Sequence, residues 1–284
     1  MKGISCNSNF LSNMPVVQAI DVLAGEGYQA IDICMELAFP SVPVPTPHLV
    51  PSDDTATRNK VRRHAEQAGI AIAAMNAHTN ICARDPEVRK ANKQHLEGAV
   101  QMAADLGAPF VVTTGGNKDA YGYEQWYWDW TVELLGEVLP LAERLGITLA
   151  IEAGSPSGCL IWNLELISKL LATKGLESIR VLFDPAHYHL RGDDPVQAVK
   201  TLGRQIVHVH AKDAAGNPEN IVFPPLGEGE IDFDPLFKAL ADSGFDGYIA
   251  MEYEAFAWDF PKDQHKVLLE SKAFLDGLVS KYWN

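Results

Sequence analysis

The sequence predicts a single (β/α)8 barrel. Short apolar runs rich in β-branched residues alternate with longer segments of helical period, over 284 residues of which 47% are hydrophobic. This alternation is typical of a parallel sheet whose strands are joined by crossover helices, and the length suits an eight-stranded barrel. We therefore expect residues 1–284 to form one barrel domain. An open doubly wound sheet is the alternative fold, but no GxGxxG motif follows the first strand.

The strands are expected where the apolar runs lie between helical segments. In order they are Gly3–Cys6, Ala30–Ile33, Ala71–Asn76, Phe110–Thr114, Thr148–Glu152, Ile179–Asp184, Ile206–His210 and Tyr248–Glu252. Apolar residues three and four positions apart predict helices between them, for example Pro86–Leu106 and Trp126–Leu145. Glycine follows many of these segments, as at Gly107 and Gly146, because it enters the left-handed conformation without a Cβ clash.

Two connections are unusually long, Met35–Asp53 and Ala211–Ile231. Both follow the carboxyl end of a strand, where barrels place their active sites. The first contains five prolines, which restrict its backbone. We expect it to cover the site as a lid, with Phe39 and His48 meeting the far end of a substrate. A packing loop that supports a neighbouring subunit is the alternative.

Composition narrows the classes of partner. The chain has 23 basic and 37 acidic residues and a net charge of −14, which argues against nucleic acid as a partner. The first residues lack the apolar run of a signal peptide, and no apolar stretch is long enough to span a bilayer. We therefore expect a cytoplasmic protein with no membrane partner. The four cysteines form no CxxC pair and are expected to be free thiols.

Polar residues end four successive predicted strands: Glu152 in ITLAIE, Asp184 in IRVLFD, His210 in IVHVH and Glu252 in YIAME. Adjacent strands lie about 5 Å apart, so these side chains should meet around one mouth of the barrel. Three carboxylates without a cation would repel one another. With an imidazole they form a hard ligand set, which favours one divalent ion: Mn²⁺ first, with Mg²⁺ or Co²⁺ also suitable. The alternative is that each residue only caps its strand or pairs with a surface lysine.

The runs IEAG, FDPAH, HVHAKD, LGEGEIDF and AMEYE resemble the xylose-isomerase-like barrel superfamily. This group includes sugar isomerases, ketose 3-epimerases, inosose dehydratases and zinc apurinic-site endonucleases. The resemblance implies that Glu152, Asp184, His210 and Glu252 occupy the metal-ligand positions. It also implies that Glu152 and Glu252 act as the acid/base pair of an isomerase or epimerase, which moves a proton of a small sugar or keto-sugar through a metal-bound cis-enediolate.

Further residues are candidates for binding that sugar substrate. His187, three residues after Asp184, stands where the family commonly contacts a substrate oxygen or the metal. Lys212 could stabilise the enediolate oxygen, or could form an exposed salt bridge to Asp213 or Glu254.

Asn76 and His78 close the third strand and are candidate hydrogen-bond partners for the sugar, with turn formation as the alternative. Glu36, beyond the second strand, is a weaker candidate. His208 is expected to point outward into the helix layer and to be structural. Trp126 and Trp130 favour core packing or a subunit interface over a sugar-stacking wall, and we expect a homo-oligomer.

Other functions of this scaffold are weighed on particular positions. A zinc phosphodiesterase would need metal ligands at the positions of Ile221 and Phe223, which cannot supply them. A lyase or dehydratase that acts on a keto-sugar or inosose needs the same metal and base, so it stays open beside the isomerase. A non-catalytic metabolite-binding barrel is the third hypothesis, and the presence of both Glu152 and Glu252 counts against it.

Overall fold

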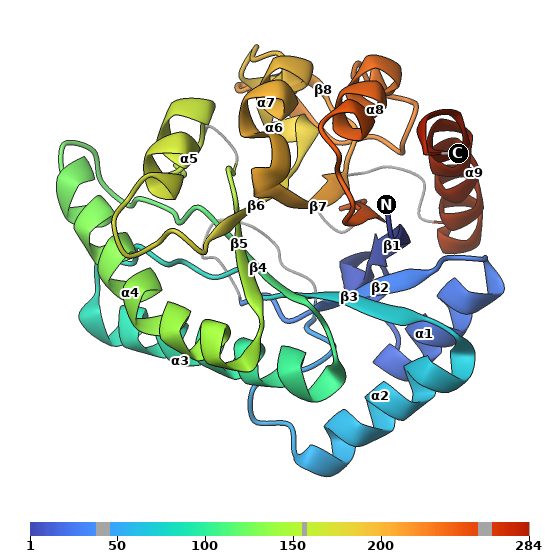
Figure 1. The fold of residues 1–284 in the computed structure, drawn as a ribbon, viewed down its shortest axis with the longest axis horizontal. Coiled ribbons are helices and arrows are strands. Elements are labelled where there is room, and N and C mark those ends of the chain that lie inside the picture. Colours follow the sequence, from blue (N-terminus) through green and yellow to red (C-terminus); the bar gives the residue numbers. More distant parts are fainter. Residues whose placement is uncertain (38–45, 155–157, 255–262, 284) are drawn as a thin grey trace.

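The computed structural model describes residues 1–37, 46–154, 158–254 and 263–283. Eight parallel strands close into a barrel in the order β1-β10-β7-β6-β5-β4-β3-β2, which confirms the predicted fold class (Figure 1). The barrel strands are β1 (Gly3–Asn7), β2 (Ala30–Cys34), β3 (Ala71–Asn76), β4 (Phe110–Thr114), β5 (Thr148–Glu152), β6 (Arg180–Phe183), β7 (Ile206–Ala211) and β10 (Tyr248–Met251).

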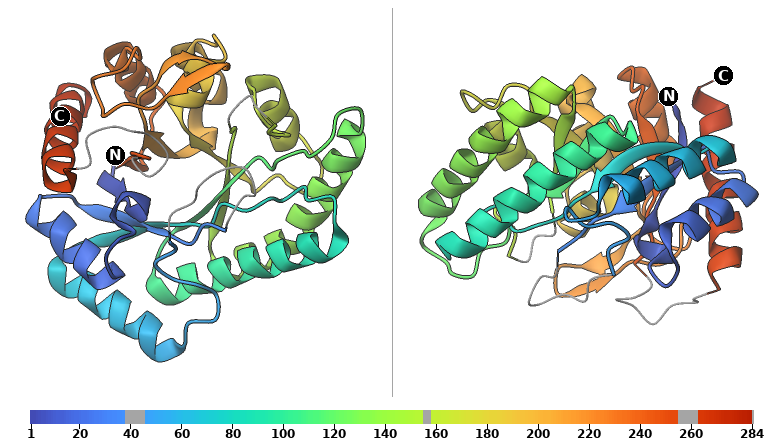
Figure 2. Two further views of the ribbon diagram at one scale, coloured as in Figure 1. Left: turned by 180° about the vertical axis from the view of Figure 1, so that it is seen from behind. Right: turned by 90° about the horizontal axis from the view of Figure 1, so that it is seen from below.

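Helices surround this barrel on its outside (Figure 1). They are α1 (Val16–Gly25), α2 (Thr55–Ala68), α3 (Pro86–Leu106), α4 (Glu124–Leu145), α5 (Leu164–Leu171), α6 (Pro185–Leu190), α7 (Pro195–Leu202), α8 (Phe233–Asp242) and α9 (Gln264–Tyr282), with short 3₁₀ helices η1 (Ser8–Leu11) and η2 (Gly203–Gln205). Helix α9 packs beside β1, so the last helix lies next to the first strand (Figure 2). None of the helices in the described part of the chain combines the length and apolar character that a membrane crossing requires.

Local sequence explains where the predicted helices begin and end. Helix α3 starts where the Asp85 carboxylate accepts a hydrogen bond from the Glu87 amide, and Pro86 occupies the first turn, where its missing N–H costs nothing. It ends at Gly107, whose φ of 77° is left-handed. The same rule ends α4 at Gly146. Helix α3 therefore has the predicted bounds, whereas α4 ends as predicted but begins two residues before the predicted Trp126, without a side-chain cap.

A layer of apolar side chains supports the polar end of the barrel. Ala150 and Leu182 belong to a small buried cluster with residues of β3 and β4. They precede Glu152 and Asp184 by two positions, and side chains two apart along a strand share a face. The cluster therefore fills the barrel below the carboxylates, which can be buried because the strands beneath them are well packed.

The two long connections differ in what the structure describes. Within Ala211–Ile231 a small antiparallel hairpin forms from β8 (Ala215–Asn217) and β9 (Asn220–Val222), which the sequence pattern did not predict. Residues 38–45 of the proposed lid, with Phe39 and three of its prolines, lie outside the described residues.

The prediction for His48, which is described, is wrong. Its Nδ1 lies 2.7 Å from Ser8 Oγ, and its Nε2 lies 3.2 Å from the Leu11 carbonyl oxygen and 3.1 Å from that of Met14. Both ring nitrogens therefore have partners in η1 and the turn after it, so this side chain anchors the connection instead of facing a substrate.

Candidate functional site

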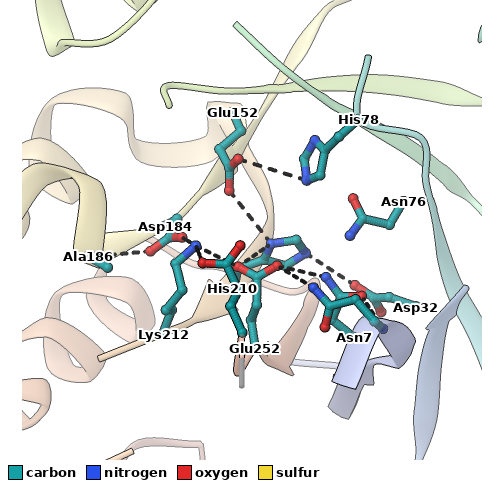
Figure 3. Close-up of polar contacts among 12 residues, drawn as sticks. Asn7, Asp32, Asn76, His78, Glu152, Asp184, Ala186, His210, Lys212 and Glu252 are labelled. Carbon is teal, nitrogen blue, oxygen red and sulfur yellow. Dashed lines mark hydrogen bonds and ion pairs between the residues drawn. The ribbon is translucent and has the colours of Figure 1, made fainter. Parts of the chain in front are cut away.

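The structure brings Glu152, Asp184, His210 and Glu252 together at the carboxyl ends of β5, β6, β7 and β10 (Figure 3). All four side chains are buried. His210 lies between the two glutamates, with Nδ1 3.6 Å from Glu152 Oε1 and 3.3 Å from Glu252 Oε2. Asp184 stands one residue beyond β6 and caps α6 by accepting a hydrogen bond from the Ala186 amide. This capping hydrogen bond uses Oδ1 of Asp184, so Oδ2 is left to face the cluster.

Lys212 is the cation of this cluster. Its Nζ lies 2.8 Å from Asp184 Oδ2, 2.9 Å from Glu252 Oε2 and 3.7 Å from Glu254 Oε2. The residue is only 3% exposed, so the exposed salt bridge considered for it is wrong. Burial alone would lower the pKa of Lys212, but the surrounding carboxylates outweigh it and hold that pKa well above its ordinary value. The lysine is therefore charged, and it lies over the ring of Phe223.

His187 and His78 approach the cluster from two other elements. On α6, His187 Nε2 lies 3.4 Å from Asp184 Oδ2, while after β3 His78 Nε2 lies 3.9 Å from Glu152 Oε2. Burial lowers the pKa of His187 to about 3, assisted by the charge of Lys212, and burial also lowers the pKa of His78. Both rings are therefore neutral near pH 7, when an imidazole nitrogen can bind a metal or accept a hydrogen bond.

Asn76 and Glu36 form a pair at the ends of β3 and β2. The Asn76 amide donates a hydrogen bond of 3.2 Å to Glu36 Oε1, while Asn76 Oδ1 has no hydrogen-bond partner among the described residues. Burial raises the pKa of Glu36 to about 8, and the negative charge of Glu252 contributes to the shift. This carboxyl group therefore carries its proton near pH 7.

Two residues that sequence reasoning missed contact the same cluster from β1 and η1. Asn7 Nδ2 donates a 2.7 Å hydrogen bond to Glu252 Oε1, and Asn9 Nδ2 lies 3.5 Å from the same oxygen. The rule that found the other residues, a polar side chain at the end of an apolar strand, applies equally to Asn7 in GISCN. Applying the same rule to the first strand would have identified Asn7.

The prediction for His208 is wrong. Residues two apart on a strand face the same side, so His208 points the same way as His210 and not into the helix layer. Its Nε2 lies 2.5 Å from Asp32 Oδ2, and its ring packs 5.6 Å from that of His210. Asp32, in the middle of β2, is the other polar residue that was missed.

The segment LGEGEIDF is positioned by the carboxylate of Asp213. Its oxygens accept hydrogen bonds of 2.9 Å from the backbone amides of Ala214, Gly227 and Gly229. Three amides directed at one carboxylate fix the end of the long connection next to Lys212. The LGEGEIDF segment therefore has a structural role in holding this loop, whereas the neighbouring Lys212 contacts the carboxylate cluster.

The arrangement fits a bound cation. Glu152 Oε1 and His210 Nδ1, which lie 3.6 Å apart, are both buried without a hydrogen-bond partner in the described residues. Buried polar atoms are normally paired, so a set of unpaired atoms in one place indicates a missing partner. Two groups with ligand atoms within 4.8 Å of one another have the composition of a metal site: Glu152, Asp184 and His187, and His78, Glu152 and His210.

The aromatic segment after β4 is partly exposed. Trp126 is 55% exposed and stacks on Tyr123 with ring centroids 4.9 Å apart, whereas Trp130 is half-buried beneath the Arg89 guanidinium. Core packing is therefore excluded for Trp126, and a subunit interface stays a prediction. The four cysteines are buried free thiols, as expected.

Comparison with protein families matches residues 20–278 to the family described as xylose isomerase-like TIM barrel. Among curated relatives, an inosose dehydratase of Clostridium perfringens is 28% identical over 142 residues, which cover 45% of this chain and 47% of that protein. The match thus spans about half the length of that relative. An inosose isomerase of Bacillus licheniformis is 24% identical over 217 residues, 74% of this chain and 77% of that protein.

Solved structures share the same fold along the whole chain. One described as a D-tagatose 3-epimerase-like protein superposes with a TM-score of 0.80 at 20% identity, covering 99% of this chain and 98% of the other. Another, described as IOLI protein with a binding zinc atom, gives a TM-score of 0.79 at 20% identity, with 99% of each chain covered. At this identity the likeness concerns the fold.

Proposed function

Because the chain belongs to the xylose isomerase-like TIM barrel family, we propose that it is a divalent-metal-dependent isomerase or epimerase of a small sugar or keto-sugar. The observation that carries the proposal is the convergence of Glu152, Asp184, His210 and Glu252 from four strands, with Glu152 Oε1 and His210 Nδ1 buried without a hydrogen-bond partner among the described residues. The relatives named inosose isomerase and inosose dehydratase support a keto-polyol of the inosose type as one substrate class.

Glu152, Asp184, His210 and Glu252 would hold the ion, and His187 stands close enough to Asp184 to join them. Carboxylate-rich donors with one imidazole suit Mn²⁺, with Mg²⁺ or Co²⁺ as alternatives. A bound divalent ion would polarise a substrate carbonyl and make the neighbouring C–H more acidic. The chemistry that remains is proton transfer, which the side chains must perform.

Glu152 and Glu252 are the proposed acid/base pair. Burial would raise the pKa of Glu152, but His210 and His78 outweigh it and lower that pKa to about 2, so this carboxylate is ionised and can accept a proton. Glu252 is held by Asn7 on one oxygen and by Lys212 on the other. Burial would raise its pKa, but the charges of His210 and Lys212 outweigh this effect, hold the pKa well below its ordinary value and keep the carboxylate ionised. Two ionised carboxylates on either side of His210 could remove a proton and return one to the opposite face or to the neighbouring carbon.

The remaining polar groups suit a sugar. Lys212, charged and buried, would stabilise the negative oxygen of an enediolate. His187, His78 and Asn76 each present an atom that has no hydrogen-bond partner in the described part of the chain and could therefore bind a substrate hydroxyl.

Dehydration of a keto-sugar or inosose is the second candidate, and Glu36 favours it. A lyase needs an acid that protonates the leaving hydroxyl, in addition to the base. Glu36, with its pKa raised to about 8, carries a proton that it could donate. The relatives named inosose dehydratase support the same reading.

Incubation with a panel of ketoses, 3-keto sugars and inososes in D₂O with Mn²⁺ separates these functions. Deuterium incorporated next to the carbonyl without loss of water supports the isomerase or epimerase. Loss of water supports the dehydratase, and Glu36→Gln should then abolish it while leaving exchange in place. A protein that exchanges no proton of any of these substrates would be a metabolite-binding barrel, and the proposal would be wrong.

A further inference from the structure

We propose that Asp32 is a positioning residue that holds His210 with its Nδ1 directed to the metal. The inference rests on the proposed function, because it takes His210 to be a ligand. Asp32 itself has no acid/base or ligand role in the proposed function.

Asp32 reaches His210 across the inside of the barrel. It lies on β2, and in the closed sheet β1 and β10 separate that strand from β7. The contact is therefore not one of neighbouring strands, and both side chains must point into the barrel. Asp32, Ser5, His208 and His210 are all completely buried. A buried carboxylate costs free energy unless its oxygens are paired, so its partners define its role.

Three groups surround the Asp32 carboxylate. Ser5 Oγ donates a 2.5 Å hydrogen bond to Oδ1, while His208 Nε2 at 2.5 Å and His210 Nε2 at 3.5 Å both face Oδ2. A carboxylate can only accept hydrogen bonds, so each nitrogen that faces it is stabilised with its proton on.

This pairing determines the tautomer of His210. If Nε2 carries the proton toward Asp32, the lone pair of the neutral ring lies on Nδ1, the nitrogen near Glu152 and Glu252. The opposite tautomer would point an N–H at the ion and remove His210 from the ligand set. In other metalloproteins, a carboxylate that accepts a hydrogen bond from the second nitrogen of a metal-bound histidine fixes the tautomer and orientation of that ring. At 3.5 Å the contact is longer than an ordinary hydrogen bond, and we expect it to shorten once Nδ1 binds a cation.

His208 keeps Asp32 in place for this task. His208 precedes His210 by two residues on β7, and its Nε2 makes a short contact with Asp32 Oδ2. This contact holds the carboxylate beside both imidazole rings. The competing interpretation is a second ion, because ligand atoms of Asp32, His208 and His210 also lie within 4.8 Å of one another. The test therefore counts ions as well as measuring affinity.

The experiment is a Mn²⁺ titration of metal-free wild-type protein, Asp32→Asn and Ser5→Ala, read by calorimetry. Asp32→Asn should weaken binding about 10- to 100-fold, the usual effect of removing such a partner. Ser5→Ala is the matched control: it removes a hydrogen bond to the other oxygen of the same carboxylate without touching either histidine, so its affinity should stay close to that of wild type.

A second measurement does not depend on a variant that folds. NMR of ¹⁵N-histidine-labelled wild type loaded with Zn²⁺ should show His210 protonated at Nε2 and bound through Nδ1. Three results would overturn the inference while leaving the proposed function in place. The first is the opposite protonation pattern of His210, and the second is equal Mn²⁺ affinity of Asp32→Asn and wild type. The third is two ions per chain, one of which is lost in Asp32→Asn. Wild-type protein that binds no ion would overturn the proposed function as well.

Discussion

Replacing Lys212 by methionine should destabilise the metal-free protein strongly and the Mn²⁺-saturated protein much less. The ammonium lies within 2.9 Å of two buried carboxylates, Asp184 and Glu252. Removing one partner of a buried ion pair costs about 3–5 kcal/mol because the other charge stays buried and uncompensated. Methionine keeps a similar apolar stem over Phe223, so packing is largely preserved. A bound divalent ion would neutralise the same carboxylates, so it should offset most of the loss.

Thermal unfolding with and without Mn²⁺ measures this difference. For a chain of this size about 1 kcal/mol corresponds to about 2–4 °C, so the metal-free variant should melt on the order of 10 °C below wild type. Lys238→Met is the matched control: it breaks an exposed pair with Asp242, 2.7 Å away, and should not change Tm measurably. If Lys212→Met loses the same stability with and without Mn²⁺, the carboxylates do not share a cation and the reasoning is refuted.

Three further predictions concern catalysis, metal content and pH. Glu152→Gln and Glu252→Gln should each lower turnover at least about 10²-fold, measured as deuterium exchange, and full activity of either variant would remove it from the acid/base pair. Elemental analysis should find one divalent ion per chain, and chelation should abolish exchange until Mn²⁺ or Co²⁺ is added; three tightly bound zinc ions would contradict this. Burial lowers the pKa of His187 from 6.5 to about 3. Between pH 6.5 and pH 3, His187 is therefore protonated in the unfolded state but neutral in the folded state. The free energy of unfolding of the metal-free protein should therefore fall as pH drops from 6.5 toward 3, and urea titrations that show no such fall would contradict the assignment.

The sequence predicted the strands and the convergence of their polar ends because both depend on local pattern. The ranges of β3, β4 and β5 agree with the structure to the residue, and Glu152 follows from its place at the end of a strand. Asp32 could not be found in this way. It interrupts an apolar strand, AIDIC, and its partner His208 stands far away in sequence, so only the closed barrel shows that the two meet. The error at His208 was different, because the two-residue period of a strand already placed it with His210.

Metal binding should release protons, and His210 should supply about one of them per ion; Asp184, whose pKa burial raises to about 7, can supply a further part. Burial lowers the pKa of His210, but the charge of Glu252 and contacts with Asp32 and Glu152 outweigh this and raise the pKa well above its ordinary value. The metal-free ring is therefore protonated on both nitrogens near pH 7, and Nδ1 must lose its proton before it can bind. Apparent Mn²⁺ affinity should rise with pH across neutrality for this reason. Calorimetric titrations in two buffers of different ionisation enthalpy measure the protons released, and His210→Asn should release about one proton fewer than wild type. Equal heats in both buffers for wild type would show that His210 is already neutral or is not a ligand.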